Sequence, residues 1–118
     1  MRGASLFGGS VLLVAVVGLS GCKSRYIEAT VHNGSGAAVS VVEVDYPSAS
    51  FGKETLADGA DYHYRFKVQG DGPLKVMWTD KAQQDHSVAG PQLQEGDEGT
   101  LMVTIKATDA SWDVNVRK

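Results

Sequence analysis

The sequence predicts an all-β protein, an antiparallel sandwich of seven or eight short strands in residues 26–118. Three observations predict this fold class. Apolar and polar residues alternate with a period of two, and turn-forming clusters recur roughly every eight to twelve residues. In addition, no stretch of this region has the apolar period of a helix. Such alternation is typical of strands that bury one face and expose the other.

The predicted strands lie, in order, at residues 26–32, 39–46, 53–56, 62–68, 74–79, 86–89, 100–106 and 112–116. The strand at 26–32 shows the alternation clearly, because Ile27, Ala29 and Val31 share one face and polar residues share the other. Asn33 to Gly36 then forms a turn, since Asn, Gly and Ser favour turn conformations.

The second strand, residues 39–46, is rich in β-branched residues. If Val42, Val44 and Tyr46 face the core, the intervening acidic residues face water. Pro47 ends this strand because proline has no amide hydrogen for the ladder. Residues 48–52 are then expected to form a loop of small residues with one aromatic, followed by the short strand at 53–56.

Residues 62–68 and 74–79 are predicted to pair as a hairpin. A two-residue loop would set a core valine opposite Lys75, whereas a three-residue loop pairs Val68 with Val76 and Phe66 with Trp78. A slip of one residue would move charges into the core, so the three-residue loop is favoured.

The remaining strands close the predicted sandwich. Residues 86–89 are expected to form a short edge strand that stops at Gly90-Pro91. The polar turn at 94–99 precedes a strand that buries Leu101, Val103 and Ile105, and the final strand carries Trp112 and two valines.

One short stretch resembles a known motif. Leu56, Gly59 and Tyr62, followed by Tyr64 and Phe66, look like the tyrosine corner of fibronectin type III domains. In that family the tyrosine hydroxyl bonds to the upstream backbone and fixes the arch between the sheets. The resemblance implies an immunoglobulin-like sandwich and no activity, since such domains are mostly binding or spacing modules. About three or four predicted strands follow Tyr62 where that family has one, so the strand order stays open.

Residues 1–21 are predicted to be a cleaved secretory leader. Arg2 and the amino group give a positive start, and the uncharged apolar run at 6–17 follows. A membrane span needs about 18–20 apolar residues, so this run is too short to cross a bilayer.

The leader ends in Leu19, Ser20, Gly21 and Cys22, which resemble the lipobox of bacterial lipoproteins. In that family signal peptidase recognises the first three positions and cuts before the cysteine. The cysteine sulfur carries a diacylglycerol, and the new amino group is often acylated. The resemblance therefore implies lipid attachment, palmitate-type chains included, at Cys22.

The expected organisation is a leader at 1–21, a lipidated cysteine with a short tether at 22–25, and a β-sandwich at 26–118. The three residues 23–25 reach about 10 Å when extended, which would hold the domain against the headgroups. In enterobacterial-type sorting, Asp after the cysteine favours the inner membrane. Lys23 therefore favours the outer membrane, with the domain facing the periplasm.

Composition limits the function classes. The full chain has a net charge of −3, and removal of Arg2 with the leader makes the remainder more acidic, which argues against nucleic acid as a partner. With one cysteine the chain cannot form an internal disulfide, so packing must stabilise the domain.

A metal site is not expected. His32, His63, His86, Met77 and Met102 invite a copper hypothesis, but a blue-copper site needs a cysteine, and Cys22 is assigned to the lipid. In the predicted hairpin Met77 and His63 are about 13 Å apart, too far to share an ion. Scattered surface histidines are the favoured interpretation, with no metal or cofactor.

Catalysis is not expected either. Glu43 and Asp45 lie about 7 Å apart on one strand face, a spacing an inverting glycosidase could use, but no cleft accompanies them. The acidic turn from Glu95 to Glu98 lacks the ligand spacing of an EF-hand. No G-x-S-x-G context or phosphate-binding glycine loop is present.

The stretch from Tyr46 to Phe51 is the preferred candidate for a binding loop, because a proline-fixed loop with an aromatic at each end offers a flat contact surface. The alternative is that both rings plug the open end of the sandwich.

Three hypotheses follow, in order. The first is a lipid-anchored, non-catalytic envelope module with a protein partner. The second is a periplasmic binder of a metal or small ligand through His63 or His86. The third, an envelope hydrolase that depends on Glu43, is the weakest.

Overall fold

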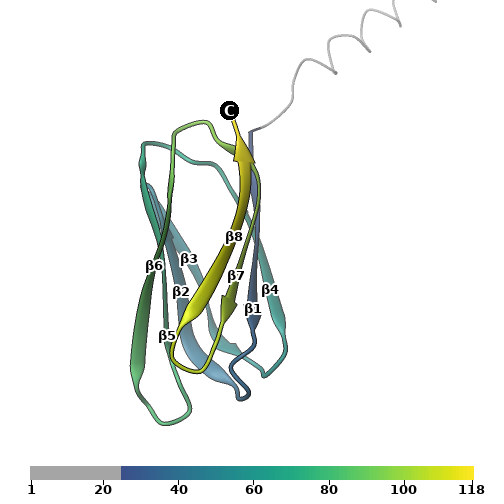
Figure 1. Cartoon of the computed structure of the whole chain (residues 1–118), viewed down its shortest axis with the longest axis vertical. Helices are drawn as coiled ribbons and strands as arrows, with labels where there is room; N and C mark the ends of the chain where they lie inside the picture. The colour runs from purple at the N-terminus through teal and green to yellow at the C-terminus, as the bar shows by residue number, and fades with distance from the viewer. Residues whose placement is uncertain (1–24) are drawn as a thin grey trace, which may run out of the picture.

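The computed structural model describes residues 25–118, which form two four-stranded sheets packed face to face (Figure 1). The eight strands are β1 (Ile27–Asn33), β2 (Val39–Tyr46), β3 (Ala49–Leu56), β4 (Asp61–Phe66), β5 (Gly72–Thr79), β6 (Asp85–Leu93), β7 (Glu98–Ile105) and β8 (Ala110–Arg117). The predicted all-β sandwich is confirmed. Within the described residues no helix could span a membrane.

The strand order is β4-β1-β7-β8 in one sheet, called the first sheet, and β3-β2-β5-β6 in the other, called the second sheet. Neighbouring strands of residues 25–118 run antiparallel except β1 and β7, which are parallel. The parallel pair joins the first strand to the seventh, so residues far apart in the sequence complete the first sheet.

The core lies between the sheets and is built by the predicted alternation. The inward residues of β1, β5 and β7 are almost fully buried, and they are Ile27, Ala29, Val31, Leu74, Val76, Trp78, Leu101, Val103 and Ile105. Val42 and Val44 of β2 are buried as expected, and Tyr46 is half-buried against the same core. Burial of this apolar surface is the main stabilising contribution, since no disulfide is possible.

The sandwich has two distinct ends. At the entry end, the described chain begins beside the C-terminus, and the links 47–48, 67–71 and 94–97 turn there (Figure 1). The far end carries the links 34–38, 57–60, 80–84 and 106–109. Each β-strand therefore runs the length of the sandwich between these ends.

The predicted hairpin of residues 62–68 with 74–79 is wrong. β4 pairs with β1 in the first sheet, and β5 pairs with β2 and β6 in the second, so the 67–71 link crosses between layers. Phe66 faces Ile27 across the ladder, and Trp78 faces His86. Both aromatic side chains are still buried, because alternation specifies the face of a strand but not its neighbour.

Two predicted boundaries also change. The expected loop at 48–52 is a tight turn at Pro47 and Ser48, and β3 begins at Ala49. The strand expected to stop at Gly90-Pro91 runs on to Leu93. β6 tolerates Pro91 because it lies at the edge of its sheet. A side chain at Gly90 would meet the Trp112 ring at 2.6 Å, so glycine here lets β8 close over β6.

The far end is held by one buried amide. The Nδ2 of Asn33, which is fully buried, donates to the carbonyl oxygens of Ala37, Leu56 and Ala57 at 2.8, 3.0 and 3.1 Å. Its Oδ1 accepts hydrogen bonds from the backbone and hydroxyl of Ser35. Asn33 thereby fixes the 34–38 and 57–60 links to each other.

The stretch that resembles a tyrosine corner lies at this same end. Leu56 is buried, and Gly59 adopts a φ of 77° and donates its amide to the Asn33 carbonyl. The side-chain hydrogen bonds of residues 25–118 do not include one from the Tyr62 hydroxyl; its ring instead lies near Phe51 and Lys53. The bridging hydrogen bonds described at this end come from Asn33.

Candidate functional site

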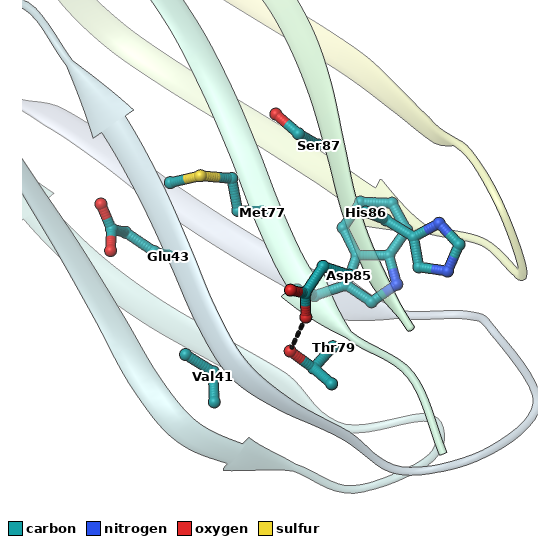
Figure 2. Close-up of a pocket in the computed structure, with 8 residues that line it drawn as sticks. Val41, Glu43, Met77, Thr79, Asp85, His86 and Ser87 are labelled. Carbon is teal, nitrogen blue, oxygen red and sulfur yellow. Dashed lines mark hydrogen bonds between the residues drawn. The ribbon is translucent and has the colours of Figure 1, made fainter. Parts of the chain in front are cut away.

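The outer face of the second sheet contains an open hollow of about 290 Å³ (Figure 2). It lies over β5, with β2 on one side and β6 on the other. The residues that line it are Val41, Glu43, Met77, Trp78, Thr79, Asp85, His86 and Ser87. Because Thr79 ends β5 and Asp85 begins β6, the hollow lies toward the far end of the sandwich.

A β-bulge in β2 shapes one wall of the hollow. The pairing register of β2 with β5 shifts between Ser40 and Glu43, and Val41 within the shift has a φ of 51°. This conformation is unfavourable for a β-branched residue, and Val41 is 62% exposed. Bulges of this kind redirect side chains, and here the bulge turns an apolar residue outward.

Gly52 of β3 makes the bulge possible. It pairs with Glu43, and a Cβ at this position would overlap the carbonyl oxygen of Val42. The edge strand can therefore approach the bulged strand only with glycine there.

Three side chains lie in register across the face. Glu43 of β2 pairs with Met77 of β5, and Met77 pairs with Ser87 of β6. Figure 2 shows the Met77 side chain extending toward Glu43. The hollow thus combines a flexible apolar floor with a carboxylate on its β2 side.

A second carboxylate borders the hollow on the β6 side. Asp85 accepts a hydrogen bond of 2.7 Å from the Thr79 hydroxyl, which fixes one oxygen beside the floor (Figure 2). The hollow is therefore flanked by an acidic group on each side.

The two carboxylates considered from the sequence, Glu43 and Asp45, are neighbours on this face. A hydrogen bond between their carboxyl groups and their like charge raise the pKa of Glu43, with burial adding to the effect. Lys75 lies 3.9 Å from Asp45 and partly offsets the repulsion. One Asp45 oxygen is enclosed without a hydrogen-bond partner. The region has more negative charge than its single lysine neutralises.

His86 ties the hollow to the β5–β6 link. Its ring stacks on Trp78 with centroids 5.0 Å apart, and its Nε2 lies 2.8 Å from an Asp80 oxygen. The other Asp80 oxygen accepts the backbone amides of Ala82 and Gln84. Hydrogen bonding to His86 and to these amides holds the pKa of Asp80 below its ordinary value.

The three histidines do not come together. His32 contacts Asp61 at 2.5 Å and His63 contacts Thr30 at 3.0 Å on the first sheet, whereas His86 belongs to the second. Met77 and Met102 are likewise on different sheets. No group of three or more His, Cys, Asp or Glu residues within 25–118 has the geometry to hold a metal ion.

The two aromatic residues of the expected binding loop pack against other aromatic rings. Tyr46 stacks on Phe66 with ring centroids 4.0 Å apart, and Phe51 stacks on Tyr64 at 4.5 Å. Phe51 is only 6% exposed, so its ring closes the side of the sandwich, whereas the alternative interpretation placed both rings at the open end.

Carboxylates of the acidic turn at 94–98 also have hydrogen-bond and ion-pair partners within the domain. Asp97 accepts the backbone amide of Gln94 at 2.8 Å, and Glu98 pairs with Arg117 at 3.1 Å.

Sequence reasoning missed the hollow and the bulge that shapes it. A signal was present, because the buried residues Val39 and Val42 are three positions apart and so break the period of two. Gly52 within a strand is a second signal, since interior glycine marks a bulge or close approach. The lipobox residues Leu19, Ser20, Gly21 and Cys22 lie outside the described residues.

Comparison with known proteins supports the fold and gives no information about function. No protein-family model matches the chain, and no curated protein does. A solved structure, "NMR structure of the protein from Eubacterium rectale", is similar to it with a TM-score of 0.57 and 10% sequence identity. The similarity covers 80% of this chain and 94% of that one.

Proposed function

We propose that the chain is a bacterial cell-envelope lipoprotein whose leader is removed and whose Cys22 carries the lipid. The lipobox-like residues Leu19 to Cys22 support this proposal, as does the position of β1, which begins only five residues after the cysteine. Lys23 favours the outer membrane, with the domain on the periplasmic side.

The domain serves as a non-catalytic interaction module. The observation that carries this proposal is the hollow, where a strained, exposed Val41 stands beside Met77 and two carboxylates. An eight-residue strand is about 26 Å long, so a hollow toward the far end is held away from a membrane at the entry end.

The occupant is a protein segment with a lysine or arginine side chain. Val41 and Met77 offer an apolar surface for the methylene stem, while Glu43 and Asp85 offer carboxylates for the cationic head. The excess negative charge around Glu43 and Asp45 favours a cation and opposes an acidic partner.

The anchor is tested with Cys22→Ser in the full-length chain, with Ser20→Ala as a matched control that keeps a small residue in the lipobox. Cys22→Ser is expected to accumulate as an uncleaved, unlipidated precursor, as measured by mass spectrometry of the membrane fraction. Ser20→Ala is expected to be processed. Normal cleavage and membrane retention of Cys22→Ser would refute the anchor.

The interaction surface is tested by a photo-crosslinking residue placed at Val41 in intact cells. Met102, which is 39% exposed on the first sheet, provides the control position. A discrete protein adduct is expected from position 41 only, and Glu43→Lys should abolish it by charge repulsion. Equal adducts from both positions, or an adduct insensitive to Glu43→Lys, would overturn the proposal.

The two weaker hypotheses gain no support from the geometry. His63 and His86 lie on different sheets and cannot share an ion. Glu43 and Asp45 are neighbours on an open face, whereas an inverting glycosidase needs its two carboxyls on either side of a bound substrate, with room for a water.

A further inference from the structure

A second groove, of about 360 Å³, lies on the side of the sandwich at its entry end. Called the tyrosine groove here, it is formed by the first described residues, the β2–β3 turn and the end of β4. The side chains that give it its character are Tyr26, Tyr46, Tyr64, Arg65 and Lys67.

The rings and cations of the tyrosine groove contact one another. The Arg65 guanidinium lies 4.3 Å from the centre of the Tyr26 ring, and the Lys67 ammonium lies 5.5 Å from it. These cation–π contacts hold both positive groups at the groove without consuming their hydrogen-bond donors. Tyr46 is fixed by its stacking on Phe66, and burial raises the pKa of its hydroxyl, which stays protonated.

The groove side of the entry end carries positive charge. Arg65 is paired with Glu28 at 3.0 Å, but Lys67 makes no ion pair within residues 25–118. The Arg25 guanidinium lies instead beside Gly96 of the 94–97 link, on the other side of this end.

The opposite side of the same end is acidic. Gly70 and Asp71, at the end of the 67–71 link, meet the 94–97 link there, with Glu95 accepting the amide of Gly70 and Asp71 accepting the amide of Glu95. Lys118 lies 3.8 Å from Asp97 and partly neutralises this side. The entry end is therefore polarised, with the tyrosines, Arg65 and Lys67 on one flank and Asp71, Glu95 and Asp97 on the other.

The tether places this polarised end at the membrane. Only residues 23–25 separate Cys22 from Tyr26, and three residues reach about 10 Å. Tyrosine, with an apolar ring and a polar tip, suits the headgroup level of a bilayer, and lysine and arginine are attracted to anionic lipids there.

We propose that the tyrosine groove binds the phosphate groups of anionic phospholipids in the membrane that carries the anchor. This inference rests on the proposed lipid attachment at Cys22. It deepens that proposal by assigning an orientation: the domain tilts so that the β2–β3 turn and the end of β4 contact the headgroups. Asp71 and the 94–97 link stay in water, and the hollow on the second sheet remains accessible.

The test imposes the anchor chemically, so that it does not depend on lipidation in the cell. Residues 25–118 enclose their own core, so a chain that begins at Cys22 can be produced without the leader. Its single cysteine is coupled to a maleimide phospholipid in nanodiscs of phosphatidylcholine with phosphatidylglycerol. Paramagnetic lipid headgroups then report, by NMR line broadening, which backbone amides lie near the bilayer.

We expect stronger broadening at Ser48 and Lys67, on the groove side, than at Gly96 and Asp97, on the acidic side. Lys67→Glu is expected to abolish this difference. Lys81→Glu makes the same charge change at an exposed residue of the far end and is expected to preserve it.

Two results would overturn the inference. Equal broadening of both sides in the unsubstituted domain would show that the groove does not hold headgroups, and an acidic protein segment would then be its better occupant. Equal effects of Lys67→Glu and Lys81→Glu would show that net charge alone sets the orientation. Either result leaves lipid attachment at Cys22 to be decided by its own experiment.

Discussion

Asn33 shows how one residue can determine the geometry of a whole end of the sandwich. Its amide donates to carbonyl oxygens of two separate links, and its side-chain oxygen accepts from Ser35. A buried backbone carbonyl that loses its donor costs about 1–3 kcal/mol. The turn composition of residues 33–36 predicted a turn here, but it did not predict that asparagine would be buried.

Asn33→Asp should therefore be strongly destabilising. The substitution keeps the shape of the side chain but replaces the donating amide with an acceptor, which faces carbonyl oxygens and carries a buried charge. We expect a loss of about 3 kcal/mol in the free energy of unfolding, as measured by urea denaturation. Asn115→Asp, at an exposed position of β8, should change it by less than about 0.5 kcal/mol. Similar effects of the two variants would contradict the assigned role.

Glu43 should make stability depend on pH. Because its pKa is raised in the folded state, its contribution is fully present below the unfolded value near 4.5 and is lost as pH rises through the folded value. Glu43→Gln should be more stable than the unsubstituted protein at pH 7, with the difference shrinking toward pH 4. Thermal unfolding across this range measures it. Glu54→Gln, on the exposed part of β3, is the control, and a pH-independent difference for Glu43→Gln would contradict the explanation.

At the scale of strands, alternation predicted which residues are buried far better than it predicted which strands pair. Faces depend on a local period of two, so Ile27, Val76 and Val103 could be assigned from the sequence. Neighbours depend on which edge a strand joins, and the two sheets present equivalent apolar faces. The sequence therefore favoured a local hairpin, whereas the fold pairs Phe66 with Ile27, which lies on the first strand.

The candidate site was harder to predict than the core. Glu43 and Asp45 were considered for catalysis, but the hollow beside them depends on the bulge at Val41 and on Asp85 from another strand. A bulge shifts register by one residue, and its only local signs were the spacing of Val39 and Val42 and the glycine at 52. The three-dimensional juxtaposition required the strand order, which alternation does not contain.

Gly52→Ala should break the contact between β2 and β3. The added methyl group overlaps the Val42 carbonyl in the ladder, so the strands must separate or the bulge must flatten. We expect a loss of about 2–3 kcal/mol in the free energy of unfolding and a weaker crosslink from position 41. Gly72→Ala, where the added group would lie 3.6 Å from Pro47, should be close to neutral. Equal tolerance of both substitutions would contradict the close approach.

For the whole molecule, stability should be distributed by sheet position. β1 and β7 are central in the first sheet, and β2 and β5 are central in the second, so their amides bond to neighbours on both sides. Native-state hydrogen exchange should be slowest in these four strands and faster in the edge strands β3, β4, β6 and β8. Uniform exchange across the eight strands would contradict this arrangement.

The position of β1 between β4 and β7 has a mechanical consequence for the proposed lipid anchor at Cys22. Any pull transmitted from the bilayer through residues 23–25 acts along the axis of β1, whereas its hydrogen bonds to both neighbours run across that axis. The force is shared by two complete ladders at once, so they cannot open one bond at a time. The proposed attachment point thus coincides with the strand best placed to resist shear.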